Sequence, residues 1–174
     1  MNMSTRIGSV VVAVASALLI AAGPSAAPAT GNHVKQVPIS GAESYVPVPA
    51  EGVIFCTGLP GPIYRVVNSH GRFTHLGQTS AVLTTDSCEL TAAGLVLDGH
   101  ATRTAADGDQ LYASFHDTID PASGTDTGQA IFTGGTGRFA GATGSGTFAG
   151  TIDLSTLEGA FTFTGTISPV GSSQ

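Results

Sequence analysis

Positive charge is scarce in this sequence. Lysine and arginine together number six against twelve aspartates and glutamates, which gives a formal net charge of −6. Only 10% of the 174 residues are charged, where about 25% is usual for a soluble domain. So few cations cannot build the basic surface that a nucleic-acid backbone requires. We therefore exclude nucleic-acid binding as a main activity.

Helical periodicity is missing as well. No stretch repeats its apolar residues with a sustained period of about 3.6, and tryptophan is absent. Hydrophobic residues nevertheless make up 41% of the chain, which is too many for a disordered acidic protein. The length fits one domain, so the composition predicts a single folded domain with little helix.

Cysteine is nearly absent, since Cys56 and Cys88 are the two in the chain. In an exported protein, two cysteines predict one disulfide. A metal pair or a reactive thiol is the functional alternative, but neither cysteine belongs to a CxxC motif or has a histidine at ligand spacing. We therefore predict a structural disulfide between them.

The N-terminal residues have the plan of a secretory signal peptide. Arg6 is the only cation of a short leading segment, residues 7–22 are an uncharged apolar run, and small residues follow. The alternative is an uncleaved membrane anchor, but the run is shorter than the about 20 apolar residues that span a bilayer. Ala27 and Ala29 fit the small-residue rule for cleavage before Thr30. We expect a signal peptide over residues 1–29, a secreted or cell-envelope protein, and no membrane span after cleavage.

The rest of the chain divides by composition. Residues 30–51 are rich in proline, serine and glycine, and we interpret them as a flexible, extended arm or linker. Residues 52–168 contain short runs broken by glycine and aspartate about every 8–12 residues, which is typical of an all-β sandwich or barrel. Residues 169–174 form a C-terminal tail.

Alternating apolar and threonine positions mark the strands. In residues 159–167, Phe161 and Phe163 share one face while threonines occupy the other. The same pattern predicts strands at residues 63–68, 74–83, 95–104, 111–115, 127–134, 146–153 and 159–167. Closing such a meander removes its exposed sheet edges. We predict a single eight-stranded antiparallel meander barrel, with an open sandwich as the alternative.

The segment TGGTGRF, continued as AGATGSGTF, resembles two known families. Gly134, Gly135, Thr136, Gly137 and Phe139 match the GGTG-x-F segment of plant dirigent proteins. The same residues are similar to the GGSG-x-F turn of allene oxide cyclases, with threonine in place of serine. Both families are eight-stranded barrels of the calycin-like type that use the barrel interior as their site. The glycines also have a structural explanation as a turn motif, because a tight corner needs positive φ or close backbone approach.

A broader likeness covers most of residues 52–167 and involves exported bacterial proteins of unassigned role. Those proteins resemble this chain in a THLG strand at residues 74–77, an AADGDQL hairpin at residues 105–111 and the terminal TGGTGRFAGATGSGTF. The resemblance implies an exported bacterial barrel of the allene oxide cyclase or dirigent type. The activities of those two families are cyclisation of an unsaturated fatty-acid epoxide and steering of phenoxy-radical coupling. None of their catalytic residues matches a position here.

Cofactor, metal and nucleophile motifs lack their structural context. Residues 135–140 formally fit the dinucleotide fingerprint, but no βαβ unit surrounds them. The aspartates between positions 107 and 126 lack the ligand order of a calcium loop, and the histidines lack metal spacing. No serine lies in a G-x-S-x-G elbow. We therefore expect no cofactor and no metal.

The hairpin of residues 97–117 carries the strongest site candidates. A two-residue Asp-Gly turn sets His100 beside Phe115, whereas a three-residue Asp-Gly-Asp loop sets Arg103 opposite Ala113. A slip of one residue exchanges the two faces of the hairpin. Both registers stay open, and each puts a titratable side chain on an apolar face.

A titratable side chain inside a small barrel is costly unless it is paired or solvated. We interpret His100 or Arg103 as a pocket residue that orients a ligand. The alternative is that it pairs with Asp98 or Asp117 near the barrel mouth. Secondary candidates for the rim of the pocket are Tyr64, His75 and Tyr112.

The expected function follows from this fold. The sequence predicts a barrel that holds a small apolar or unsaturated ligand, in a binding role or as an isomerase- or cyclase-type enzyme. The alternative is a non-enzymatic cell-envelope or interaction module whose barrel is filled by Phe148, Phe161 and Phe163. The interior cavity distinguishes the two. We expect a monomer or a small homo-oligomer.

Overall fold

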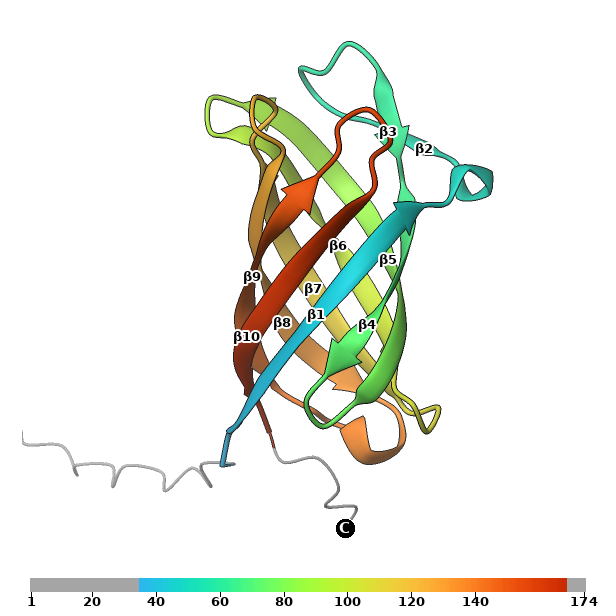
Figure 1. The fold of residues 1–174 in the computed structure, drawn as a ribbon, viewed down its shortest axis with the longest axis vertical. Helices are drawn as coiled ribbons and strands as arrows, with labels where there is room; N and C mark the ends of the chain where they lie inside the picture. The colour runs from blue at the N-terminus through green and yellow to red at the C-terminus, as the bar shows by residue number, and fades with distance from the viewer. Residues whose placement is uncertain (1–34, 169–174) are drawn as a thin grey trace, which may run out of the picture. The chain divides into compact units, whose positions relative to one another are not determined.

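The computed structural model describes residues 35–168, and these form a closed antiparallel barrel (Figure 1). Eight strands follow one another around the barrel in sequence order, and the first pairs with the last. The predicted signal peptide, the first residues of the predicted arm and the C-terminal tail lie outside the described residues. Between residues 35 and 168, no helix is long and apolar enough to cross a membrane.

The prediction of an eight-stranded antiparallel meander is confirmed, and the open sandwich is wrong. The barrel strands are β1 (Val37–Pro47), β4 (Val66–Phe73), β5 (Gly77–Thr91), β6 (Gly94–Thr104), β7 (Gln110–Ile119), β8 (Thr125–Gly135), β9 (Gly144–Ile152) and β10 (Gly159–Ile167). The short strands β2 (Val53–Phe55) and β3 (Pro62–Tyr64) pair with each other outside the barrel sheet. Two single 3₁₀ turns, η1 (Pro49–Glu51) and η2 (Gly137–Phe139), complete the elements.

The barrel begins at Val37, so half of the segment predicted as a flexible arm is strand β1. This strand pairs with β10 on one side and β4 on the other, and it closes the barrel. Its buried face carries Ile39, Glu43 and Tyr45. Because a glycine and a glutamate interrupt the apolar alternation along that face, the period-two pattern was too weak to predict the strand.

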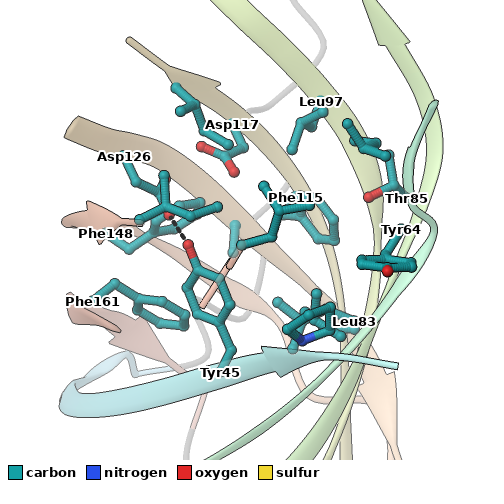
Figure 2. A pocket seen from close by; sticks show the side chains of 18 of the residues that line it. Tyr45, Tyr64, Leu83, Thr85, Leu97, Phe115, Asp117, Asp126, Phe148 and Phe161 are labelled. Carbon is teal, nitrogen blue, oxygen red and sulfur yellow. Dashed lines mark hydrogen bonds between the residues drawn. The ribbon is translucent and has the colours of Figure 1, made fainter. Parts of the chain in front are cut away.

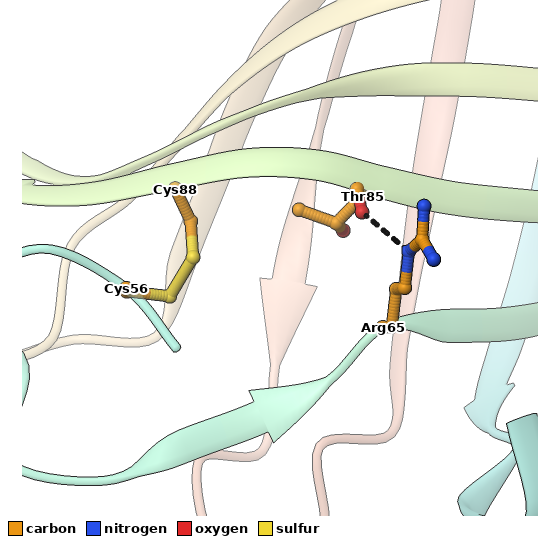
Figure 3. Close-up of a disulfide and its surroundings, with 4 residues drawn as sticks. All are labelled: Cys56, Arg65, Thr85 and Cys88. Atoms are coloured by element: carbon orange, nitrogen blue, oxygen red, sulfur yellow. Dashed lines mark hydrogen bonds between the residues drawn. A yellow bond between two sulfur atoms is a disulfide. The ribbon is translucent and has the colours of Figure 1, made fainter. Parts of the chain in front are cut away.

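The predicted disulfide between Cys56 and Cys88 is confirmed, with a Cα–Cα distance of 4.7 Å. It links the segment between β2 and β3 to strand β5 (Figure 3). Beside it, Thr57 and Glu89 form an isolated parallel bridge. Nearer to β4, the Arg65 side chain donates from Nε to the backbone carbonyl of Thr85, 3.3 Å away. The β2–β3 hairpin is therefore attached to strand β5 at several points.

Interior aromatic rings lie against glycines of neighbouring strands. A Cβ atom added at Gly99 would meet the ring of Phe115, and one added at Gly128 would meet the ring of Phe148. These two glycines face their aromatic partners from strands β6 and β8. A narrow barrel has room for large rings only where the facing position lacks a side chain, which explains much of the glycine in the strands.

One end of the barrel is filled by side chains. The TGGTGRF segment leaves β8, turns through η2 with Gly137 at φ 52°, and places Phe139 inside that end. Phe139, Leu76 and Leu111 are each 1% exposed, and Ile167 is fully buried. The Thr136 hydroxyl accepts a hydrogen bond from the backbone amide of Gln110, which holds the segment to β7. We refer to this end as the sealed end.

Candidate functional site

A cavity of about 130 Å³ occupies the half of the barrel opposite the sealed end. Ile63 and Tyr64 of β3 border it on one side, and Leu154 and Leu157 of the β9–β10 turn border it on another. Phe115, Phe148 and Phe161 are among the side chains that line its walls. The module hypothesis requires phenylalanine side chains to fill the interior, and at this end of the barrel they do not. We refer to this half as the open end.

Two carboxyl groups and a phenol meet on the wall of this cavity (Figure 2). Asp117 lies on β7 and Asp126 on the neighbouring strand β8, and the two are 7% and 3% exposed. Tyr45 reaches them from β1, across the interior, and its hydroxyl donates to Asp126 Oδ2 over 3.0 Å. We refer to Tyr45, Asp117 and Asp126 as the acid cluster.

Burial keeps a proton on the acid cluster. The pKa of Asp117 is raised from 3.8 to about 9, mainly because burial removes its solvation and also because of a hydrogen bond with Asp126 and the charge of that residue. Burial, followed by the charge of Asp126, also raises the pKa of Tyr45. At neutral pH Asp117 therefore keeps its proton beside the carboxyl group of Asp126. A proton donor beside a proton acceptor is the arrangement of general acid–base catalysts.

A second polar group lies deeper in the barrel. Arg103 of β6 donates from Nε and Nη2 to Glu43 Oε1 and Oε2 of β1, over 2.8 and 2.6 Å. Thr79 donates to Glu43 Oε1 over 3.2 Å, and the guanidinium lies 4.5 Å from the ring centre of Phe73. This bidentate pair neutralises both charges in the interior. The alternative prediction that Arg103 pairs with Asp98 or Asp117 is wrong, because Arg103 pairs with Glu43.

Neither predicted register of the β6–β7 hairpin is correct. Arg103 pairs with Leu111, and Ala101 pairs with Ala113. The loop has three residues, as in the second prediction, but it is shifted by one position, because the Ala105 amide bonds to the Asp109 carbonyl and so encloses residues 106–108. The observed register differs by two residues from the one that put Arg103 inside. A shift of two preserves the face, so Arg103 still points inward.

The five predicted site residues are divided between the inside and the outside of the barrel. Arg103 and Tyr64 line the cavity. His100 lies outside, where its Nδ1 is 2.8 Å from Asp86 Oδ2 and its side chain is 57% exposed. The Tyr112 hydroxyl donates to Gln110 Oε1, near the sealed end. His75 lies in the β4–β5 turn, also at the sealed end, with Nε2 2.9 Å from the Pro38 carbonyl oxygen.

Sequence reasoning missed the acid cluster although a signal was present. Along β7, Leu111, Ala113, Phe115 and Ile119 occupy the inward phase, and Asp117 falls in the same phase. An aspartate at an apolar position of an alternating strand must enter the core, where it needs a partner. Asp126 and Glu43 were hidden because their strands alternate less cleanly. Within residues 35–168, no three His, Cys, Asp or Glu side chains gather as a metal-ligand group.

Comparison with known proteins identifies the fold. No protein-family model matches the chain, and no curated protein sequence matches it. The structure is similar to the pterocarpan synthase dirigent protein PsPTS1, with a TM-score of 0.50 and 14% identity over 79% of this chain and 97% of that one. It is equally similar to the pterocarpan synthase dirigent protein GePTS1, with a TM-score of 0.50 and 15% identity over 80% of this chain and 88% of that one. The chain thus has the eight-stranded barrel fold of dirigent proteins, as the GGTG-x-F resemblance implied.

Proposed function

We propose that this protein binds a small apolar or unsaturated ligand in the open end of the barrel and promotes an isomerase- or cyclase-type reaction on it. The observation that carries the proposal is the acid cluster on the wall of an otherwise apolar cavity. Ligand sites are typically apolar pockets with a few convergent polar groups and shifted pKa values. Nothing about packing requires two buried carboxyl groups at this place.

Each residue of the acid cluster has a role in the proposed reaction. Asp117 holds the proton at neutral pH and donates it to the ligand. Asp126 accepts a proton from the ligand, while the Tyr45 hydroxyl fixes its orientation. The surrounding rings exclude water and restrict the conformations of the bound ligand. The two structural neighbours, described as pterocarpan synthases, make a synthase role compatible with this fold.

The alternative proposal of a filled, non-enzymatic module has less support. It fits the sealed end but not the open end, where the phenylalanines line the cavity without filling it. We further propose that the protein is secreted. The Cys56–Cys88 disulfide supports this, because such bonds persist in oxidising compartments.

Native mass spectrometry of the protein purified gently from culture medium tests the proposal. We expect a retained adduct of small-molecule mass, together with the mass of a monomer or small homo-oligomer. The released ligand, incubated with fresh protein, should convert to an isomer of the same mass but different chromatographic retention. Asp117→Asn should bind the ligand without converting it. A bare protein that stays bare after incubation with lipid and phenolic extracts would contradict ligand binding.

A matched pair of variants controls for the cavity. Ala130 lines the cavity on β8, whereas Ala149 points outward on the neighbouring strand β9. Ala130→Leu should lose the adduct, because the larger side chain occupies the ligand volume. Ala149→Leu should keep it.

A further inference from the structure

The acid cluster contains two buried oxygen atoms, Asp117 Oδ1 and Asp126 Oδ1, for which no group outside the carboxyl pair supplies a donor. Among the described residues, no backbone amide and no other side chain donates to either atom, so the pair has only the proton of Asp117 to share. Both side chains are more than nine-tenths buried and both line the cavity (Figure 2). A buried acceptor without a donor is costly. A ligand that enters the cavity can remove this cost only by bringing donors.

The charge of the cavity indicates which donors. The acid cluster places two carboxyl groups inside the barrel, and burial makes an uncompensated carboxylate unfavourable. Arg103 is a cation of the cavity lining, but its Nε and Nη2 donate to Glu43, which neutralises its charge. Because Arg103 and Glu43 neutralise each other, the carboxyl groups of the acid cluster give the open end negative rather than positive character. A cationic ligand would neutralise it, and a carboxylate would add to it.

Aromatic faces surround the same position. Phe161 lies between Tyr45 and Phe148, with ring centres 6.1 and 5.3 Å apart, and Phe115 faces them across the cavity (Figure 2). Ring faces attract cations, most strongly where water is excluded. The interior already uses this interaction once, since the Arg103 guanidinium lies over Phe73. Carboxylates and ring faces together are the chemistry that recognises an ammonium group.

We infer that the natural ligand of the cavity is a small organic amine, bound as its cation. Its ammonium group donates to Asp117 Oδ1 and Asp126 Oδ1, and its apolar or unsaturated part lies among Phe115, Phe148 and Phe161. The inference rests on the proposed function, because it names the ligand class of the same site. A neutral alcohol would supply a donor but leave the charge unbalanced. A fatty-acid carboxylate would be repelled.

Three isosteric probes separate these classes. The full chain is titrated calorimetrically with 2-phenylethylamine, 2-phenylethanol and phenylacetate at pH 7 and physiological salt. Each probe carries one phenyl ring, and the cavity of about 130 Å³ is close to the about 150 Å³ that accommodates a benzene ring. We expect the amine to bind at least about tenfold more tightly than the alcohol, and the carboxylate to bind most weakly. Equal binding of amine and alcohol, or tighter binding of the carboxylate, would overturn the inference.

Charge-neutral variants locate the effect. Asp126→Asn keeps the shape and the acceptor for Tyr45 but removes the charge, so the advantage of the amine over the alcohol should disappear. Glu89→Gln removes an exposed charge of β5 and should keep that advantage. An advantage that survives Asp126→Asn would refute the inference. If Asp126→Asn does not fold, the three wild-type affinities still decide.

The same titrations separate this inference from the proposed function. If the alcohol binds and the amine binds no better, the cavity is a ligand site and the amine inference alone fails. If none of the three probes binds and the purified protein retains no adduct, both fail.

Discussion

The sealed and open ends of the barrel are built from the same eight strands but filled differently. At the sealed end, Phe139, Leu76, Leu111 and Ile167 leave no room for solvent. At the open end, the residues facing the interior include Tyr45, Asp117 and Asp126 around a cavity. Packing at one end provides stability, which allows the other to retain buried polar groups that a core would not. Fold and site thus depend on different residues of the same strands.

Removing Phe139 should have the largest effect, at the sealed end. Phe139→Ala leaves a cavity where the side chain was 1% exposed, and such truncations cost about 3–5 kcal/mol of unfolding free energy. Urea denaturation with an unchanged m value measures the loss, and Phe139→Leu serves if the alanine variant does not fold. Ligand affinity of the folded fraction should stay unchanged. A loss below about 1 kcal/mol would contradict the importance of this packing.

Loss of the disulfide should come next and act at the open end. Replacing Cys56 and Cys88 by serine removes a cross-link over a sequence separation of 32, which the chain-entropy relation values at about 3–4 kcal/mol. Urea denaturation measures the global loss. Hydrogen exchange should show that amides of the β2–β3 hairpin lose protection while those of β1 and β10 near Ile167 keep theirs. Uniform loss of protection would argue against a local role.

Asp117 should make the stability depend on pH. Its pKa is about 9 in the fold against 3.8 ordinarily, so the folded state binds more protons than the unfolded state between those values. Stability therefore falls as pH rises through that window. Asp117→Asn stays neutral, so its stability relative to wild type should rise by about 1 kcal/mol per pH unit between pH 5 and pH 8.

Thermal unfolding across that pH range measures the effect. Glu89→Gln removes an exposed carboxylate and should leave the wild-type slope unchanged. Parallel pH profiles for wild type and Asp117→Asn would show that Asp117 is ionised in the fold.

Filling the open end should have the smallest effect on stability. Ala130→Leu places extra methyl groups in an existing cavity and should raise the unfolding free energy by about 0.5–1 kcal/mol. Ala149→Leu, on the outer surface, should stay within about 0.5 kcal/mol of wild type. Denaturant midpoints measure both. A large destabilisation by Ala130→Leu would mean that the cavity is smaller in solution.

The sequence predicted the strands whose alternation is clean and missed the one whose alternation is interrupted. Strand β10, with Phe161, Phe163 and Ile167 on one face, was predicted with its observed bounds. Strand β1 was interpreted as an arm, because Gly41 and Glu43 interrupt its buried face. The glutamate is tolerated there only because Arg103 faces it from a strand 60 residues away, which no local pattern records.

The candidate site was harder to predict than the fold for the same reason. Arg103 was identified as an inward residue, but its partner was not. His100 alternates with Arg103 and therefore points outward, so one register choice decided between them. The acid cluster joins three strands, and its Tyr45–Asp126 bond spans 81 residues. Such long-range pairs follow from barrel closure rather than from local sequence.

The pairing of β1 with β10 has a consequence for how the protein is made. Val37 pairs with Ile167, so the seam joins nearly the first described residue to nearly the last. A ribosome-bound chain that lacks β10 cannot close the barrel, and contacts so distant in sequence form slowly. Tyr45 and Glu43 both lie on β1, so the site is assembled only when the seam forms. Any truncation of β10 should therefore yield a chain without a binding site, and ligand binding reports that synthesis and folding are complete.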